Sequence, residues 1–108
     1  MTGTVNQLAW HLTAGQAEFM NIAGTNYIQV ILWGPVSYTP CQPYTENPAT
    51  DSRGVRFIAP AAAGTYPAAD ILSAFTYPDA GSMVNEFGNA GSVTITTANS
   101  TTASGSLN

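Results

Sequence analysis

Apolar and polar residues alternate along much of this chain, and Gly, Pro and Asn interrupt the pattern at short intervals. A period of two is typical of a β-strand with one buried face. The alternation, together with β-branched residues, predicts strands over 8–12, 17–22, 26–33, 54–59, 82–87, 92–97 and 101–107. The segment 70–77 predicts either a further strand or a short helix, because the preceding Pro67-Ala68-Ala69 resembles a helix start.

Seven or eight short strands, with no long helix between them, predict an all-β protein. We expect a single antiparallel β-sandwich or a small up-and-down barrel. The alternation places Val93 and Ile95 inward in 92–97, and it places Val55, Phe57 and Ala59 on one face of 54–59. The last two predicted strands, 92–97 and 101–107, are separated by a short polar turn and are expected to form a hairpin. The length of 108 residues fits one domain, residues 1–108.

One long segment, 35–53, lacks any periodicity and holds four of the seven prolines. An irregular loop of this length inside a small domain is typically functional or mobile. It contains Cys41, the only cysteine of the chain, which therefore forms no internal disulfide and no paired-cysteine metal or redox site.

Charged residues make up 7% of the chain, and the two arginines and six acidic residues give a net charge of −4. With no lysine at all, the chain lacks the basic face that nucleic acids and anionic membrane surfaces require. No apolar run reaches the length of a membrane-spanning helix, about 18 residues. The neutral polar surface favours an extracellular or cell-envelope location. The first 15 residues show neither the basic nor the apolar region of a signal peptide, so we expect no leader in this sequence.

Candidate catalytic residues are few, so the sequence predicts a protein that is not an enzyme and needs no cofactor or metal. His11 is the only histidine and is expected on the face opposite Leu8, Trp10 and Leu12. A nucleophile, a base and an orienting group do not occur together in any recognisable motif. The loop residues Glu46, Asn47 and Asp51 offer oxygen ligands for calcium, but without the spacing of a known calcium loop.

The aromatic residues give the best candidate for a binding site. In the strand 26–33, Ile28, Val30 and Leu32 share one face, and Tyr27, Gln29, Ile31 and Trp33 share the other. Three alternatives remain open for the second face: burial, a subunit interface, or an exposed platform for a ligand. If a site exists, we expect it at Tyr27 and Trp33 of this strand and at Tyr38, Tyr44 and Arg53 of the following loop.

Several short motifs occur in an order that resembles a known group of proteins. These motifs are Gly3-Thr4-Val5-Asn6, Phe57-Ile58-Ala59-Pro60, Gly64-Thr65-Tyr66-Pro67, Gly91-Ser92-Val93-Thr94-Ile95-Thr96 and Ser104-Gly105-Ser106-Leu107. The chain resembles small secreted or lipoprotein β-domains of Bacteroidota and myxobacteria, a group of unknown function. The resemblance implies an all-β fold and an extracellular or envelope location, and it implies no catalytic residues.

Two functional hypotheses follow. The first is a non-catalytic extracellular or envelope module that binds a protein partner or a glycan. The second is a structural subunit of a surface or virion assembly, such as a fibre, a decoration protein or a surface layer. The low charge and the absence of lysine favour the second hypothesis. The self-complementary strand Tyr27 to Trp33 favours it too, because an edge of this kind is expected to pair with another copy.

Overall fold

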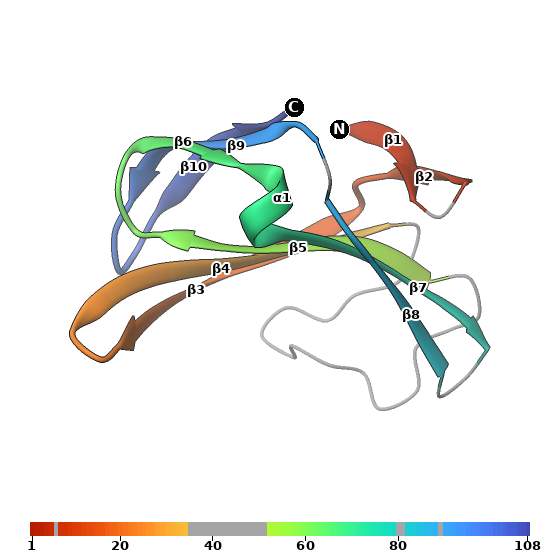
Figure 1. The fold of residues 1–108 in the computed structure, drawn as a ribbon, viewed down its shortest axis with the longest axis horizontal. Coiled ribbons are helices and arrows are strands. Elements are labelled where there is room, and N and C mark those ends of the chain that lie inside the picture. Colours follow the sequence, from red (N-terminus) through yellow and green to blue (C-terminus); the bar gives the residue numbers. More distant parts are fainter. Residues whose placement is uncertain (6, 35–51, 80–81, 89) are drawn as a thin grey trace.

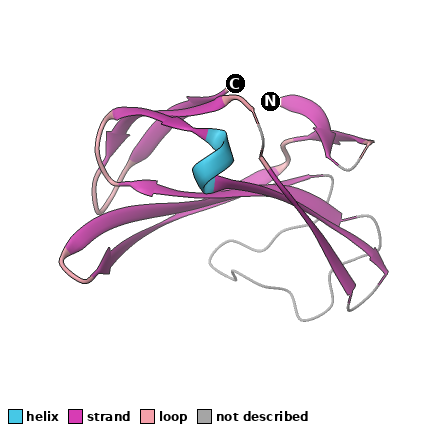
Figure 2. Cartoon of the chain, viewed as in Figure 1, coloured by secondary structure: helices cyan, strands magenta, loops and turns pink. Residues whose placement is uncertain are grey.

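The computed structural model describes residues 1–5, 7–34, 52–79, 82–88 and 90–108, and these residues form an almost entirely β structure (Figures 1 and 2). They contain ten strands in three antiparallel sheets and one helix of four residues. The expected all-β fold is thus confirmed, in the form of a small sandwich-like arrangement of separate sheets.

The largest sheet has five strands in the order β3-β4-β5-β7-β8, the second has three in the order β10-β9-β6, and β1 and β2 form a hairpin. The bounds are β1 Thr2–Val5, β2 Leu8–His11, β3 Ala14–Ile22, β4 Thr25–Gly34, β5 Ser52–Pro60, β6 Gly64–Pro67, α1 Ala68–Ile71, β7 Leu72–Asp79, β8 Ser82–Phe87, β9 Ser92–Ala98 and β10 Ala103–Leu107. Strands β3, β4, β5, β7 and β8 form the five-stranded sheet, and strands β6, β9 and β10 form the three-stranded sheet.

The strand pattern of the sequence needs three corrections. The alternation did not predict the four-residue strands β1 and β6, because each is too short to show a period of two. In addition, β6 begins with Gly64 and ends with Pro67. The segment 70–77, predicted as either a strand or a short helix, contains both. The helix α1 ends at Ile71, and the strand β7 follows directly. The irregular segment ends before residue 52, because Ser52 and Arg53 already pair with β7.

A two-residue turn connects β3 to β4 and fixes their register. Ala23 and Gly24 both have positive φ angles, of 50° and 85°, as hairpin turns of this length require. The Asn21 carboxamide oxygen accepts a hydrogen bond from the Gly24 N–H at 3.2 Å, which holds the turn closed. The alternation of β3 is thereby matched to that of β4.

The main core lies between the five-stranded and the three-stranded sheet. Ile28, Phe57 and Ala59 on one side pack with Val93 and Ile95 on the other, and all five are buried. This packing confirms the inward face expected for the strands 54–59 and 92–97. Ile58, on the opposite face of β5, remains 36% exposed.

A second apolar cluster lies on the other face of the five-stranded sheet. It consists of Ile31 and Trp33 of β4 and Phe75 of β7. Gly54 lies between Trp33 and Phe75 in the register, and a Cβ at Gly54 would lie 2.6 Å from the Phe75 ring. Because this space is free of a side chain, the two rings meet edge to face with centroids 4.8 Å apart. Strand β4 is therefore buried on both faces.

The β1–β2 hairpin covers one end of the five-stranded sheet, over the ends of β4, β5 and β7 (Figure 1). Val5 and Trp10 of the hairpin pack on Val55 of β5. Only Trp10 of the expected apolar face of 8–12 is buried; Leu8 and Leu12 are 39% and 37% exposed. The hairpin is too short to bury more than one side chain per strand against the sheet.

A search of the described residues for helices that could cross a lipid bilayer finds none of sufficient length and apolarity.

Candidate functional site

The three expected binding residues that the structure describes, Tyr27, Trp33 and Arg53, do not come together as one site. Tyr27 and Trp33 lie on the same face of β4, but six residues of extended strand separate them by about 20 Å. Tyr27 is half-buried, whereas Trp33 is only 6% exposed and packs against Phe75. Of the three alternatives for this face, the structure shows burial at Ile31 and Trp33, so Trp33 offers no open stacking platform.

Arg53 lies on the opposite face of the sheet from Trp33. It pairs directly with Gly34, the next residue along β4, and a step of one residue reverses the face. Arg53 therefore has its side chain on the hairpin side of the sheet. Tyr38 and Tyr44 lie outside the described residues, as do Cys41 and the oxygen ligands Glu46, Asn47 and Asp51. His11 is exposed, as expected.

The strand Tyr27–Trp33 cannot supply an edge for pairing with another copy. β4 is hydrogen-bonded to β3 on one side and to β5 on the other, so its backbone groups in this stretch are used within the sheet. The alternation of a strand shows which side chains share a face, but it does not reveal the neighbouring strands. This corrects the expected basis for self-association.

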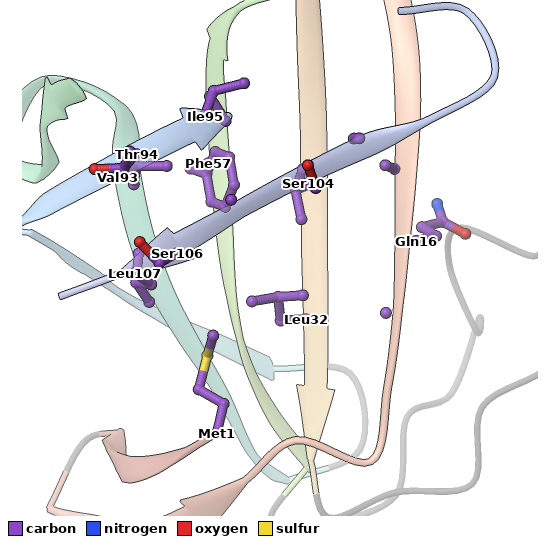
Figure 3. A pocket seen from close by; sticks show the side chains of 15 residues that line it. Met1, Gln16, Leu32, Phe57, Val93, Thr94, Ile95, Ser104, Ser106 and Leu107 are labelled. Atoms are coloured by element: carbon purple, nitrogen blue, oxygen red, sulfur yellow. The ribbon is translucent and has the colours of Figure 1, made fainter. Parts of the chain in front are cut away.

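The structure instead contains a cavity of about 360 Å³ between the two sheets (Figure 3). It lies where the edge strand β10 crosses over β3, β4 and β5, and Leu32, Phe57 and Leu107 extend into the space between them. Its lining consists of Met1, Gly15, Gln16, Ala17, Val30, Leu32, Phe57, Val93, Thr94, Ile95, Ala103, Ser104, Gly105, Ser106 and Leu107. The volume falls within the range of small ligand pockets.

Small residues on the two edge strands line this space. β3 contributes Gly15 and Ala17, and β10 contributes Ala103 and Gly105. At Gly105 a Cβ would overlap the backbone carbonyl of Thr94, so no larger residue fits the close approach of β10 to β9. The cavity is thus bordered by small residues at four positions of the two edge strands.

The side chains that line the cavity are alcohols, one carboxamide and apolar groups, and none of these side chains is titratable. The Ser104 hydroxyl is hydrogen-bonded to the Thr96 hydroxyl at 2.8 Å. The chemistry of the lining therefore fits the binding of an uncharged, largely apolar group.

A second distinctive surface is the edge strand β8. All of Ser82–Phe87 is exposed, and Met83, Val84 and Phe87 are 50%, 43% and 81% exposed. Within the described residues β8 pairs only with β7, so its outer backbone groups face outward. Lysine and proline, which commonly protect such an edge, do not occur in β8.

Sequence reasoning missed the cavity, although part of its signal is present. Gly15 and Ala17 occupy alternate positions of β3, and small residues at alternate strand positions indicate a thin region of a core. The matching positions, Ala103 and Gly105, lie more than 80 residues away. Only the tertiary structure places the two sets opposite each other.

Comparisons of the chain with protein-family models, with curated proteins and with solved structures find no match.

Proposed function

We propose that this chain is a non-catalytic binding module that holds a protein partner in the cavity between its two sheets, at an extracellular or cell-envelope location. The observation that carries the proposal is the apolar cavity of about 360 Å³, which opens between the edge strands β3 and β10. The low charge and the absence of lysine support the location, as does the resemblance to secreted and lipoprotein β-domains.

The lining favours a protein partner over a glycan. Sugars bind by stacking on exposed aromatic faces and by dense polar contacts. The one aromatic residue of the lining, Phe57, is only 7% exposed and belongs to the core. Aliphatic side chains form most of the remaining wall, and these suit the apolar side chains of a peptide.

The edges beside the cavity add a second reason. β3 pairs only with β4, and β10 only with β9, in the described part of the chain. Each edge can hydrogen-bond to an added strand, while alternate side chains of that strand enter a pocket. An extended peptide with an apolar residue at every second position therefore matches both the backbone edge and the cavity.

Ala17→Phe tests this proposal, because it places a large ring at an exposed position of the cavity wall. Peptides are first selected from a displayed random library on the wild-type protein, and their Kd values are then measured by calorimetry. We expect Ala17→Phe to weaken binding about tenfold or more, through loss of the apolar burial in the cavity.

Ala9→Phe is the matched control, because Ala9 is exposed on β2 and does not line the cavity. It is expected to leave the Kd values within about twofold. A library that yields no binding peptide contradicts the proposal, and so do selected peptides that bind Ala17→Phe as tightly as the wild type.

The exposed edge of β8 favours a second candidate function, a structural subunit that assembles with further copies of itself. A flat edge with exposed apolar residues on both faces pairs readily with another strand. Glu86 is the only charged residue in β8, so two copies brought together meet little repulsion.

Phe87→Lys is expected to abolish such assembly, because a lysine at an edge strand opposes pairing with another strand. Light scattering behind size exclusion should give the wild type a mass above the 11.2 kDa monomer that rises with concentration, and the variant 11.2 kDa throughout. Leu12→Lys makes the same charge change at an exposed residue outside β8 and should assemble like the wild type. A wild type that stays monomeric at every concentration eliminates this candidate.

A further inference from the structure

The end of the five-stranded sheet beneath the β1–β2 hairpin contains several buried hydrogen-bond donors without an acceptor. Among the described residues, these include the Trp10 indole nitrogen Nε1 and the Arg53 nitrogens Nε and Nη1. The Thr76 hydroxyl Oγ1 is likewise buried and unpartnered there. Trp10 and Thr76 are only 4% and 2% exposed.

The sheet register places these groups in one row. Arg53 of β5 is directly opposite Gly34 of β4 on one side and directly opposite Thr76 of β7 on the other. Directly opposite residues share a face, with their Cβ positions about 5 Å apart. Trp10 Nε1 lies 3.4 Å from the position of a Cβ on Gly34, so the indole N–H is at the β4 end of the same row.

Buried donors of this kind are unusual. Most buried polar groups in proteins have a hydrogen-bond partner, and an uncompensated buried cation is strongly unfavourable. These groups supply three N–H donors and one hydroxyl along the row, and the guanidinium supplies the positive charge. Arg53 as a residue is half-buried, while its Nε and Nη1 atoms are fully buried.

We propose that Arg53, Trp10 and Thr76 form a binding site for an oxyanion, the chemical group shared by phosphate, sulfate and carboxylate ligands. The guanidinium donates charge-assisted N–H hydrogen bonds to such a group, and the indole N–H and the hydroxyl supply further donors. This site is separate from the cavity, since none of the three residues lines it. The row therefore gives an acidic protein one local position that favours an anion.

The site is tested on the wild-type protein by titration with sodium phosphate, sulfate and acetate, at an ionic strength kept constant with sodium chloride. We expect the best of the three anions to raise Tm by about 5 °C at saturation, because it binds only the folded state. In two-dimensional ¹H–¹⁵N spectra, the Trp10 indole resonance should shift in a saturable manner while the Trp33 indole resonance stays in place. The ranking of the three anions distinguishes a tetrahedral ligand from a carboxylate.

Arg53→Gln removes the charge, and Arg56→Gln is its matched control. Arg56 lies on the same strand but faces the other side of the sheet, opposite Ile31 and Ser73. Arg53→Gln should weaken anion binding about tenfold or more, whereas Arg56→Gln should bind like the wild type. A purely structural role of Arg53 would instead change Tm equally in chloride and in the oxyanion.

Three outcomes overturn the proposal: no oxyanion raises Tm or shifts the Trp10 resonance of the wild type, Arg53→Gln binds as tightly as the wild type, or both arginine variants lose binding equally. If Arg53→Gln does not fold, the Trp10 resonance of the wild type decides alone.

Discussion

Replacement of Gly34 by alanine is expected to lower the free energy of unfolding by about 3 kcal/mol, the upper end of the usual range for an overfilled site. A Cβ at Gly34 would overlap the backbone carbonyl oxygen of His11. The carbonyl belongs to the backbone and the alanine methyl group has no alternative rotamer, so no side-chain rotation relieves the overlap. The N–H of Thr13 donates to the Trp33 carbonyl at 2.9 Å at the same point, which prevents the two segments from separating freely.

The same substitution should also detach the hairpin from the sheet. Trp10 is buried where the hairpin lies against the sheet, with its indole nitrogen beside Gly34. We therefore expect Gly34→Ala to increase the exposure of Trp10, measured as a red shift of its fluorescence in a protein that is still folded.

Urea unfolding followed by circular dichroism measures the loss of stability, and Gly3→Ala is the control. A Cβ at Gly3 meets nothing within 4 Å, so this change should alter the free energy of unfolding by no more than about 0.5 kcal/mol. If Gly34→Ala costs less than about 1 kcal/mol, the close approach of β2 to β4 is not as described.

The sequence predicts the strands well wherever the alternation is regular. Val93 and Ile95 are buried as expected, and the hairpin of β9 with β10 forms. The buried face of β9 and its hairpin with β10 depend on residues close together in the sequence, so the local pattern predicts them. The short strands β1 and β6 are not predicted from the alternation, because four residues are too few to distinguish a strand from a turn.

The sequence pattern did not predict which strands lie next to each other in a sheet. β4 was expected to be able to pair with another copy, but it lies inside the sheet, and the exposed edge is β8. Alternation records which side chains share a face, whereas pairing depends on contacts between distant segments. The segment 82–87 was correctly predicted as a strand, yet nothing in its pattern indicated that it would lie at an edge.

The candidate sites show the same division. Arg53 and Trp33 were expected in one site. The register pairs Arg53 with Gly34, so the side chains of Arg53 and Trp33 lie on opposite faces of the sheet. Trp10, Arg53 and Thr76 come from three strands, and no spacing in the sequence connects them. The binding role expected for Tyr27, Trp33, Tyr38, Tyr44 and Arg53 remains a prediction.

The burial of β4 on both faces leads to the second large effect. Ile28 and Ile31 are each only 2% exposed, but they point to opposite faces of the same strand. Ile28 packs between the two sheets with Val93, and Ile31 packs with Trp33 and Phe75. Ile28→Ala and Ile31→Ala should each lower the free energy of unfolding by about 3 kcal/mol, since each removes buried methyl groups and leaves a cavity.

Ile58→Ala is the control for both variants, because Ile58 lies on the adjacent strand β5 and is 36% exposed. The same atoms are removed there, but water reaches the site, so the cost should stay below about 1 kcal/mol. Urea unfolding of the three variants compares the two faces directly. A strand buried on one face only would give a large loss for Ile28→Ala and a small one for Ile31→Ala. Equal losses mean that the Trp33 face is part of the folded core, and a search for ligands should then begin at the cavity between the sheets.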